Sequence, residues 1–232
     1  MPMAIMRNAH EVLRGAMRDI QKLLEKGDLE GAASLWRKFQ RFQELHKRME
    51  EGCRDEIDPN MKQGYGVLFR MMDDHVGGVT TEAKLLNNHE ELENAEKELD
   101  RVFGNSKDSE SIKKMFAAFM EDNEAHLLAE EKVLMPSVQK MMKNGVKVKK
   151  HLKVEVLSVL LREKGDIEFF LRFGNEILQR HDNIPDQPRV RVFNHAFWAV
   201  ATPEQWRQWN QWIKESLPPA KYEEVHAAAS WC

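Results

Sequence analysis

Two histidine and glutamate pairs, each four residues apart, constrain this chain more than any other feature of its sequence. His46 with Glu50 and His126 with Glu130 stand in segments whose apolar residues recur at helical spacing. Residues four apart share one helix face, so each pair directs an imidazole and a carboxylate toward a core. Burying an unpaired polar group costs roughly 2–7 kcal/mol, and burying a charge costs more. A metal ion removes that cost, so the pattern predicts a helical bundle built around metal.

Chance alone produces some pairs of this kind. Acidic residues make up 38 of 232, so the nine histidines should have an acidic residue four positions later about once or twice. Four histidines do, the partners being Glu50, Glu93, Glu130 and Glu155. The pair of His151 and Glu155 stands among lysines in KKHLKVEV, which is typical of a solvated helix face, and we take it as the chance example. The prediction therefore depends on whether the other pairs meet in space.

Composition excludes several classes of function. A net charge of −3 and a pI near 6.3 give no overall reason to expect nucleic acid or an anionic membrane as a partner. We find no apolar run long enough to span a membrane and no secretory signal, so we expect a cytoplasmic protein. Cys53 and Cys232 are too few and too far apart for a disulfide framework or a thiolate metal site. Any metal would therefore have nitrogen and oxygen ligands, which suit iron, manganese or zinc.

Helix-forming residues dominate, and the alternation typical of strands is absent, so the sequence predicts an all-α chain. The helices expected in the first part of the chain cover about 4–26, 28–57, 80–103 and 108–136. Pro136 is expected to kink or end the last of these. Residues 58–79 are rich in helix breakers and are expected to hold one short helix near 67–73.

The sequence changes character after residue 145. Shorter apolar segments follow at 147–164, 166–181 and 189–200, and the sequence Thr202-Pro203-Glu204-Gln205 predicts a capped helix start. Trp206, Trp209 and Trp212 then recur at three-residue spacing, which favours core packing over a stacking platform for a ligand. We therefore expect an antiparallel four-helix bundle over residues 1–145, with an additional helical layer over 146–232 packed on it.

The candidate histidines lie at matching levels of the expected bundle. His10 precedes Gly27 by 17 residues and His46 follows Asp28 by 18, so both lie roughly 26 Å from their turn. His89 precedes Gly104 by 15 residues and His126 follows Asp108 by 18, a mismatch of about one turn, or ~5 Å. Histidines placed by chance would have little reason to match, so the levels support a shared site.

These segments resemble the hemerythrin-like, or HHE cation-binding, family of four-helix bundles. The matching marks are NAHEVL, LHKRMEE, NNHEEL and HLLAEEKVLMP, one on each expected helix of the bundle. The last of these is the most specific, because HLLAEE followed by LMP looks very like the fourth-helix signature of that family. The resemblance covers roughly residues 5–143.

The resemblance implies a carboxylate-bridged pair of iron ions inside the bundle, with an oxo or hydroxo bridge between them. The ligands carried over are His10 and His46 for one iron, His89 and His126 for the other, and Glu50 and Glu130 as bridges. Glu131 is the alternative bridge if the fourth helix is rotated. Manganese and zinc stay open, because ligand type alone does not separate them from iron.

The chain departs from the oxygen-carrying members of that family at one position. Those proteins have two histidines four apart on the third helix, and here the residue one turn before His89 is Leu85. Glu93, one turn after His89, or a water molecule would fill the coordination position that this leaves. Either arrangement gives dioxygen or peroxide a second route to the metals, which favours oxidation or sensing over reversible carriage.

Three functions are consistent with these observations. The first is a non-haem diiron protein that binds dioxygen or peroxide or reacts with it, for example as an oxidase. The second is an iron-handling or iron- and oxygen-sensing protein without turnover, whose folding depends on metal. The third is a metal-free scaffold that docks a protein partner through the tryptophan-rich helix, and it leaves six inward-facing polar side chains without a purpose.

Overall fold

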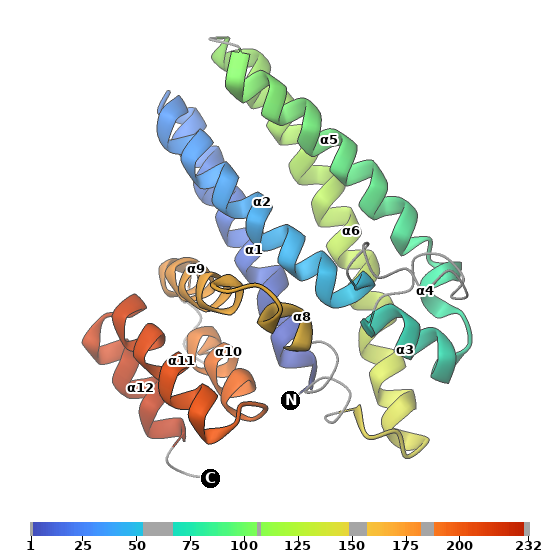
Figure 1. Cartoon of the computed structure of the whole chain (residues 1–232). Helices are drawn as coiled ribbons and strands as arrows, with labels where there is room; N and C mark the ends of the chain where they lie inside the picture. Colours follow the sequence, from blue (N-terminus) through green and yellow to red (C-terminus); the bar gives the residue numbers. More distant parts are fainter. Residues whose placement is uncertain (1, 53–66, 106–107, 149–156, 182–187, 230–232) are drawn as a thin grey trace. The chain divides into compact units, whose positions relative to one another are not determined.

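The computed structural model describes residues 2–52, 67–105, 108–148, 157–181 and 188–229. All regular structure within these ranges is helical, which confirms the predicted all-α class. Among the helices in these ranges, none has the length and hydropathy needed to cross a membrane. The chain divides into two compact units (Figure 1). We call Ala16–Val146 the bundle unit, and Met1–Gly15 with Lys147–Cys232 the tail unit.

Among its described residues, the bundle unit contains the second half of α1 and five further helices. Their bounds are α1 (Pro2–Glu25), α2 (Leu29–Glu51), α3 (Val67–Val76), α4 (Val79–Glu82), α5 (Leu85–Asn105) and α6 (Ser109–Lys143). α5 and α6 lie side by side, and α2 packs against α5 (Figure 1). α3 packs against both α2 and α6. The long helices are those expected for a four-helix bundle, and α3 is the short helix expected near 67–73.

Side-chain caps explain where two of the long helices begin. Asp28 accepts a hydrogen bond from the backbone of Gly31 at 2.9 Å, and Asp108 accepts one from Glu110 at 3.1 Å. Each cap satisfies a backbone N–H group that has no partner within its own helix. These two caps set where α2 and α6 begin, and therefore the level at which each helix presents its histidine.

The structure differs from the sequence prediction at two points in this unit. The helix expected over 80–103 is interrupted, because Lys84 adopts a positive φ of 55° between α4 and α5. α6 does not end at Pro136 but continues to Lys143. The residues Leu134, Val138 and Met141 around this proline are buried, and their packing offsets the backbone hydrogen bond that proline removes. The predicted residues 53–57 of the second helix lie outside the described ranges.

An aromatic cluster joins α2, α5 and α6 at a distance along the helices from the histidines. Trp36 stacks on Phe39 with ring centroids 5.2 Å apart and meets Phe119 edge to face at 5.1 Å. Its indole Nε1 donates a hydrogen bond to Asp100 at 2.7 Å, so the buried polar atom has a partner. The cluster fixes the three helices relative to one another, and with them the level of the residues they carry.

The tail unit is also helical. It contains the first half of α1 and the helices α8 (Leu157–Leu161), α9 (Asp166–His181), α10 (Arg189–Trp198), α11 (Pro203–Ser216) and α12 (Pro219–Ala229). Thr202 and Gln205 form the capping box that the sequence predicted for α11, with Pro203 at its first position. Trp209 is buried, as expected for core packing, while Trp206 and Trp212 are half-buried. α12 is a helix that the sequence analysis did not anticipate.

Close packing and buried amides hold the tail unit together. Asn175 of α9 and Asn194 of α10 are fully buried and bond to each other through both amides, at 3.2 and 2.6 Å. Asn175 also donates to Ser216 Oγ at 3.3 Å, which ties in the end of α11. The first half of α1 joins this unit through an ion pair between Glu11 and Arg189. The predicted packing of the residues beyond 145 on the bundle stays a prediction.

Candidate metal centre

Three helices of the bundle unit bring five of the predicted ligands into its core. α2 carries His46 and Glu50, α5 carries His89, and α6 carries His126 and Glu130. All five side chains are buried, and the two glutamates have no exposed surface at all. On α2 and α6 the flanking Leu45, Met49 and Leu127 are buried as well, which is why these faces turn inward.

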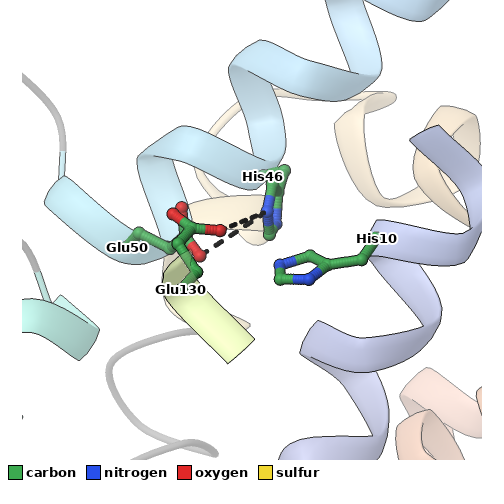
Figure 2. A group of neighbouring side chains, drawn as sticks. All are labelled: His10, His46, Glu50 and Glu130. Atoms are coloured by element: carbon green, nitrogen blue, oxygen red, sulfur yellow. Dashed lines mark ion pairs between the residues drawn. The ribbon is translucent and has the colours of Figure 1, made fainter. Parts of the chain in front are cut away.

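His46 faces both glutamates. Its Nε2 atom lies 3.5 Å from Glu50 Oε1, on the same helix, and 4.0 Å from Glu130 Oε2, on α6. In Figure 2 the two carboxylates point toward the His46 ring from α2 and α6. One nitrogen and two carboxylate oxygens from these residues lie within 4.8 Å of one another, which is close enough for one metal ion to bind them together.

A second group lies on the other side of the same carboxylates. Glu130 Oε1 is 3.0 Å from His126 Nε2 and 3.2 Å from His89 Nε2. Glu50 Oε2 lies 3.6 Å from the same His89 nitrogen. The ligand atoms of His89, His126 and Glu130 also lie within 4.8 Å of one another. Glu130 therefore belongs to both groups.

Each glutamate thus presents one oxygen toward His46 and the other toward the histidines of α5 and α6. For Glu50 the two distances are 3.5 Å to His46 and 3.6 Å to His89. A carboxylate in this position can bind two cations at once, one through each oxygen. The two glutamates are therefore shared between His46 on one side and the histidines of α5 and α6 on the other.

The electrostatics of the core favour a bound cation. Burial raises the pKa of Glu50 well above its usual range, and the neighbouring carboxylate of Glu130 raises it further. Within the described part of the chain, no N–H group donates a hydrogen bond to either oxygen of Glu50. A cation between the two carboxylates would replace their repulsion with attraction and supply the missing partner. The residues present therefore fit a metal site.

The surroundings of His89 favour its protonated form in the absence of metal. Burial alone would lower its pKa, but hydrogen bonds to Glu130 and Glu51 and the charges of both carboxylates raise it to about 9. A proton on Nε2 and a metal ion compete for the same lone pair, so metal binding at His89 must release a proton.

Two residues near His89 were not predicted. Glu51, on α2, forms a hydrogen bond with His89 Nδ1, and Phe69, on α3, stacks on the His89 ring with centroids 5.7 Å apart. The doubled glutamate in LHKRMEE was a signal for Glu51, but residues five apart do not share a helix face, so spacing from His46 gave it no role. No sequence signal placed α3 beside α5.

Two of the remaining candidates, Glu93 and Glu131, lie apart from these two groups within the described residues. Glu93 binds Lys47 and Lys97, both at 2.9 Å, and belongs to neither group. Glu131 is half-buried and also belongs to neither. His10, which Figure 2 also labels, is buried on the first half of α1 and so belongs to the tail unit. Its role as a ligand stays a prediction.

Comparison with known families gives one match. Residues 1–138 match the family described as hemerythrin HHE cation binding domain. The matched segment covers more than half of the chain and contains all six residues predicted as ligands. No curated protein and no solved structure matches the chain.

Proposed function

The chain belongs to the hemerythrin HHE cation-binding family, and from that premise we propose that it is a non-haem diiron protein that binds or reacts with dioxygen or peroxide. One observation carries the proposal: Glu50 and Glu130 each face His46 with one oxygen and His89 with the other. A single metal ion would use only one of the two oxygens of each glutamate. Because each buried carboxylate has a histidine beside each of its two oxygens, the arrangement supports a pair of ions.

Each ion would have its own histidines. His46 would bind one ion, together with His10 as the family resemblance implies, and His89 and His126 would bind the other. Glu50 and Glu130 would bridge them. Iron is the metal we propose on the basis of the family, and the same ligand types also suit manganese and zinc.

A metal pair of this kind stabilises negative charge that develops on dioxygen or peroxide during reduction. The protein's own contribution is to hold the ligands and to exclude water. Leu45, Met49 and Leu127, which flank the ligands in sequence, are buried, and Phe69 covers one face of His89. A dry surrounding strengthens every electrostatic interaction with the bound ions.

The surroundings of Leu85 support reaction over reversible carriage. This leucine is fully buried one turn before His89 and supplies no ligand. Glu93, one turn after His89, is engaged by two lysines. We propose that the coordination position without a histidine is left to a small molecule such as water or the oxygen substrate.

Metal analysis with absorption spectroscopy tests the proposal. After anaerobic loading with iron and exposure to air, the wild type should hold about two irons per chain and show near-ultraviolet bands of a bridged iron pair. The double variant His126→Ala with Glu130→Ala should lose the bands and most of the iron. His75→Ala is the matched control, since this histidine is exposed on α3 and lies outside both groups. Absence of iron from the loaded wild type would overturn the proposal.

A second function, iron handling or sensing without turnover, is favoured by the mutual repulsion of the buried carboxylates. Because burial and Glu130 disfavour the ionised form of Glu50, the metal-free fold is weakened and metal binding is coupled to folding. The two functions differ in one measurement. Repeated consumption of peroxide by the loaded protein supports a reactive centre, whereas strong metal-dependent stability without consumption supports sensing.

A further inference from the structure

His89 is restrained on three sides. Its Nε2 atom faces Glu130 at 3.2 Å and Glu50 at 3.6 Å, and its Nδ1 atom shares a hydrogen bond with Glu51. Phe69 lies nearly parallel to the ring, at an interplanar angle of 16°. The imidazole can therefore neither flip about its χ2 bond nor tilt without losing one of these contacts.

The two nitrogens of this ring have different partners with different roles. An imidazole that binds a metal through one nitrogen commonly donates the N–H of the other to a carboxylate, which fixes the tautomer and makes the ligand more basic. Glu51 occupies the position of that carboxylate. His126 offers a contrast, because its Nδ1 atom has no hydrogen-bond partner among the described residues.

The position of Glu51 on α2 explains how two adjacent glutamates take different places. Successive helical residues point about 100° apart, so Glu50 and Glu51 cannot both face the same point. Glu50 has no exposed surface and lies between the histidines, whereas the Glu51 side chain is 11% exposed and reaches the far side of the His89 ring. Glu51 is therefore not placed as a bridge.

We propose that Glu51 is a positioning residue for the metal centre. It accepts the Nδ1 proton of His89 and so holds Nε2 toward the two bridging glutamates, which sets the metal affinity of the side formed by His89 and His126. The proposal rests on the proposed function, because it requires that the centre binds metal. Phe69 supports the same orientation by covering the ring face.

A merely structural role for Glu51 makes a different prediction. If Glu51 only stabilised the fold through its ion pair with His89, its removal would lower the stability of the metal-free protein and weaken both metal positions alike. If it positions His89, the loss should be confined to one of the two positions. Metal affinity measured position by position separates the two roles.

The experiment compares Glu51→Ala, Glu51→Gln and a control, Glu44→Ala. Glu44 lies on the same helix, is exposed, and pairs only locally with Arg48 among the contacts that the structure shows for it. Zinc, which is diamagnetic, is titrated into each metal-free protein against a chelator of known affinity. We expect Glu51→Ala to weaken one of the two positions roughly 10–100-fold and leave the other unchanged. Glu51→Gln, which keeps an acceptor but loses the charge, should fall between Glu51→Ala and wild type.

A nitrogen-15 NMR spectrum of the zinc-loaded proteins supplies a readout that a structural role would not move. In the wild type the ring proton of His89 should lie on Nδ1, and in Glu51→Ala its signal should shift or broaden through exchange with water. Equal affinity in wild type and Glu51→Ala would overturn this inference while leaving the metal centre intact. Wild type that binds no metal would overturn both the inference and the proposed function.

Discussion

The two units bury polar side chains in opposite ways. In the tail unit, Asn175 and Asn194 have no exposed surface, and each amide hydrogen-bonds the other. In the bundle unit, Glu50 and Glu130 are buried equally completely, but they face each other, and the charge of Glu130 adds to burial in raising the pKa of Glu50. Uncharged amides are both donors and acceptors and can satisfy one another, whereas two carboxylates have only acceptors when ionised.

This difference distinguishes a buried polar network that only stabilises the fold from one that can bind a ligand. A buried network that is internally satisfied specifies one packing and needs nothing more. A buried network with an excess of acceptors is stable only when a cation or a proton is added. The carboxylates of the bundle unit therefore need a proton or a cation, whereas the paired amides of the tail unit need neither.

Metal removal is expected to produce the largest effect. Metal at about 1,000 times its dissociation constant should raise the free energy of unfolding by ~4 kcal/mol, because only the folded bundle presents the ligands together. Thermal unfolding of the iron- or zinc-loaded protein and of the chelator-treated protein measures the difference. Identical melting curves would show that the carboxylates of the bundle unit are satisfied in some other way.

Asn194→Ala tests the opposite side of the comparison. The change removes the N–H donor of Asn175 Oδ1 and leaves this buried oxygen without it, so we expect a loss of roughly 1–3 kcal/mol in unfolding free energy, with no change in metal content. Denaturant unfolding with metal analysis measures both. Asn210→Ala, a half-buried amide of the same unit that donates to Tyr222, should cost less. A loss of metal in Asn194→Ala would contradict the separation of roles.

Glu50→Gln should change stability with opposite signs in the two metal states. In the folded protein the pKa of Glu50 is raised above its ordinary value of 4.5, so its contribution to stability is complete below that pH and is lost as the pH rises through the folded pKa. Without metal, the neutral amide should therefore stabilise the protein at high pH, an advantage that vanishes near pH 4.5. With metal, it should weaken binding. Destabilisation in both states would show that the carboxylate is satisfied without a cation.

Glu96→Gln should have the smallest effect of the four. Burial raises the pKa of Glu96 from 4.5 to about 8, against the opposing charge of Lys47. Its contribution to stability is complete below pH 4.5 and is lost as the pH rises through 8, so Glu96→Gln should gain stability at pH 9 and nothing at pH 4. The full shift would correspond to ~5 kcal/mol, but Glu96 is only half-buried and water screens its charge, so we expect a gain of about 1 kcal/mol. Melting temperatures across this range test it. Glu98→Gln is the control, because Glu98 is exposed and pairs with Arg101. A pH-independent gain would show that desolvation of the carboxyl is not the cause.

Much of this architecture follows from local patterns in the sequence. Apolar spacing predicted the helical class, the helix starts expected near residues 28 and 108 coincide with the caps that Asp28 and Asp108 form, and matching levels predicted that His46, His89 and His126 would lie together. Those inferences work because a helix converts sequence distance into height and angle. That the cluster binds metal stays a prediction.

The features that escaped prediction depend on contacts between distant segments. Phe69 reaches His89 only because α3 packs against α2 and α6 after a segment rich in helix breakers. Glu51 acquires its role from the position of α5, which the sequence of α2 does not encode. The positive φ between α4 and α5 falls on Lys84 rather than on a glycine, so no sequence signal marked this interruption. Local spacing carries no information about such contacts.

The tail unit is discontinuous in the sequence, and this dictates an order of events during synthesis. Its ion pair between Glu11 and Arg189 joins residues separated by 178 positions, whereas the bundle unit is one continuous segment, Ala16–Val146. A chain emerging from the ribosome presents the complete bundle segment before α9–α12 exist. The first half of α1 can therefore pack against its partners in the tail unit only after the last third of the chain has been synthesised. Closing so long a loop carries an entropic cost. Folding of this protein is accordingly expected to proceed from the middle of the sequence outward, with the two ends meeting last.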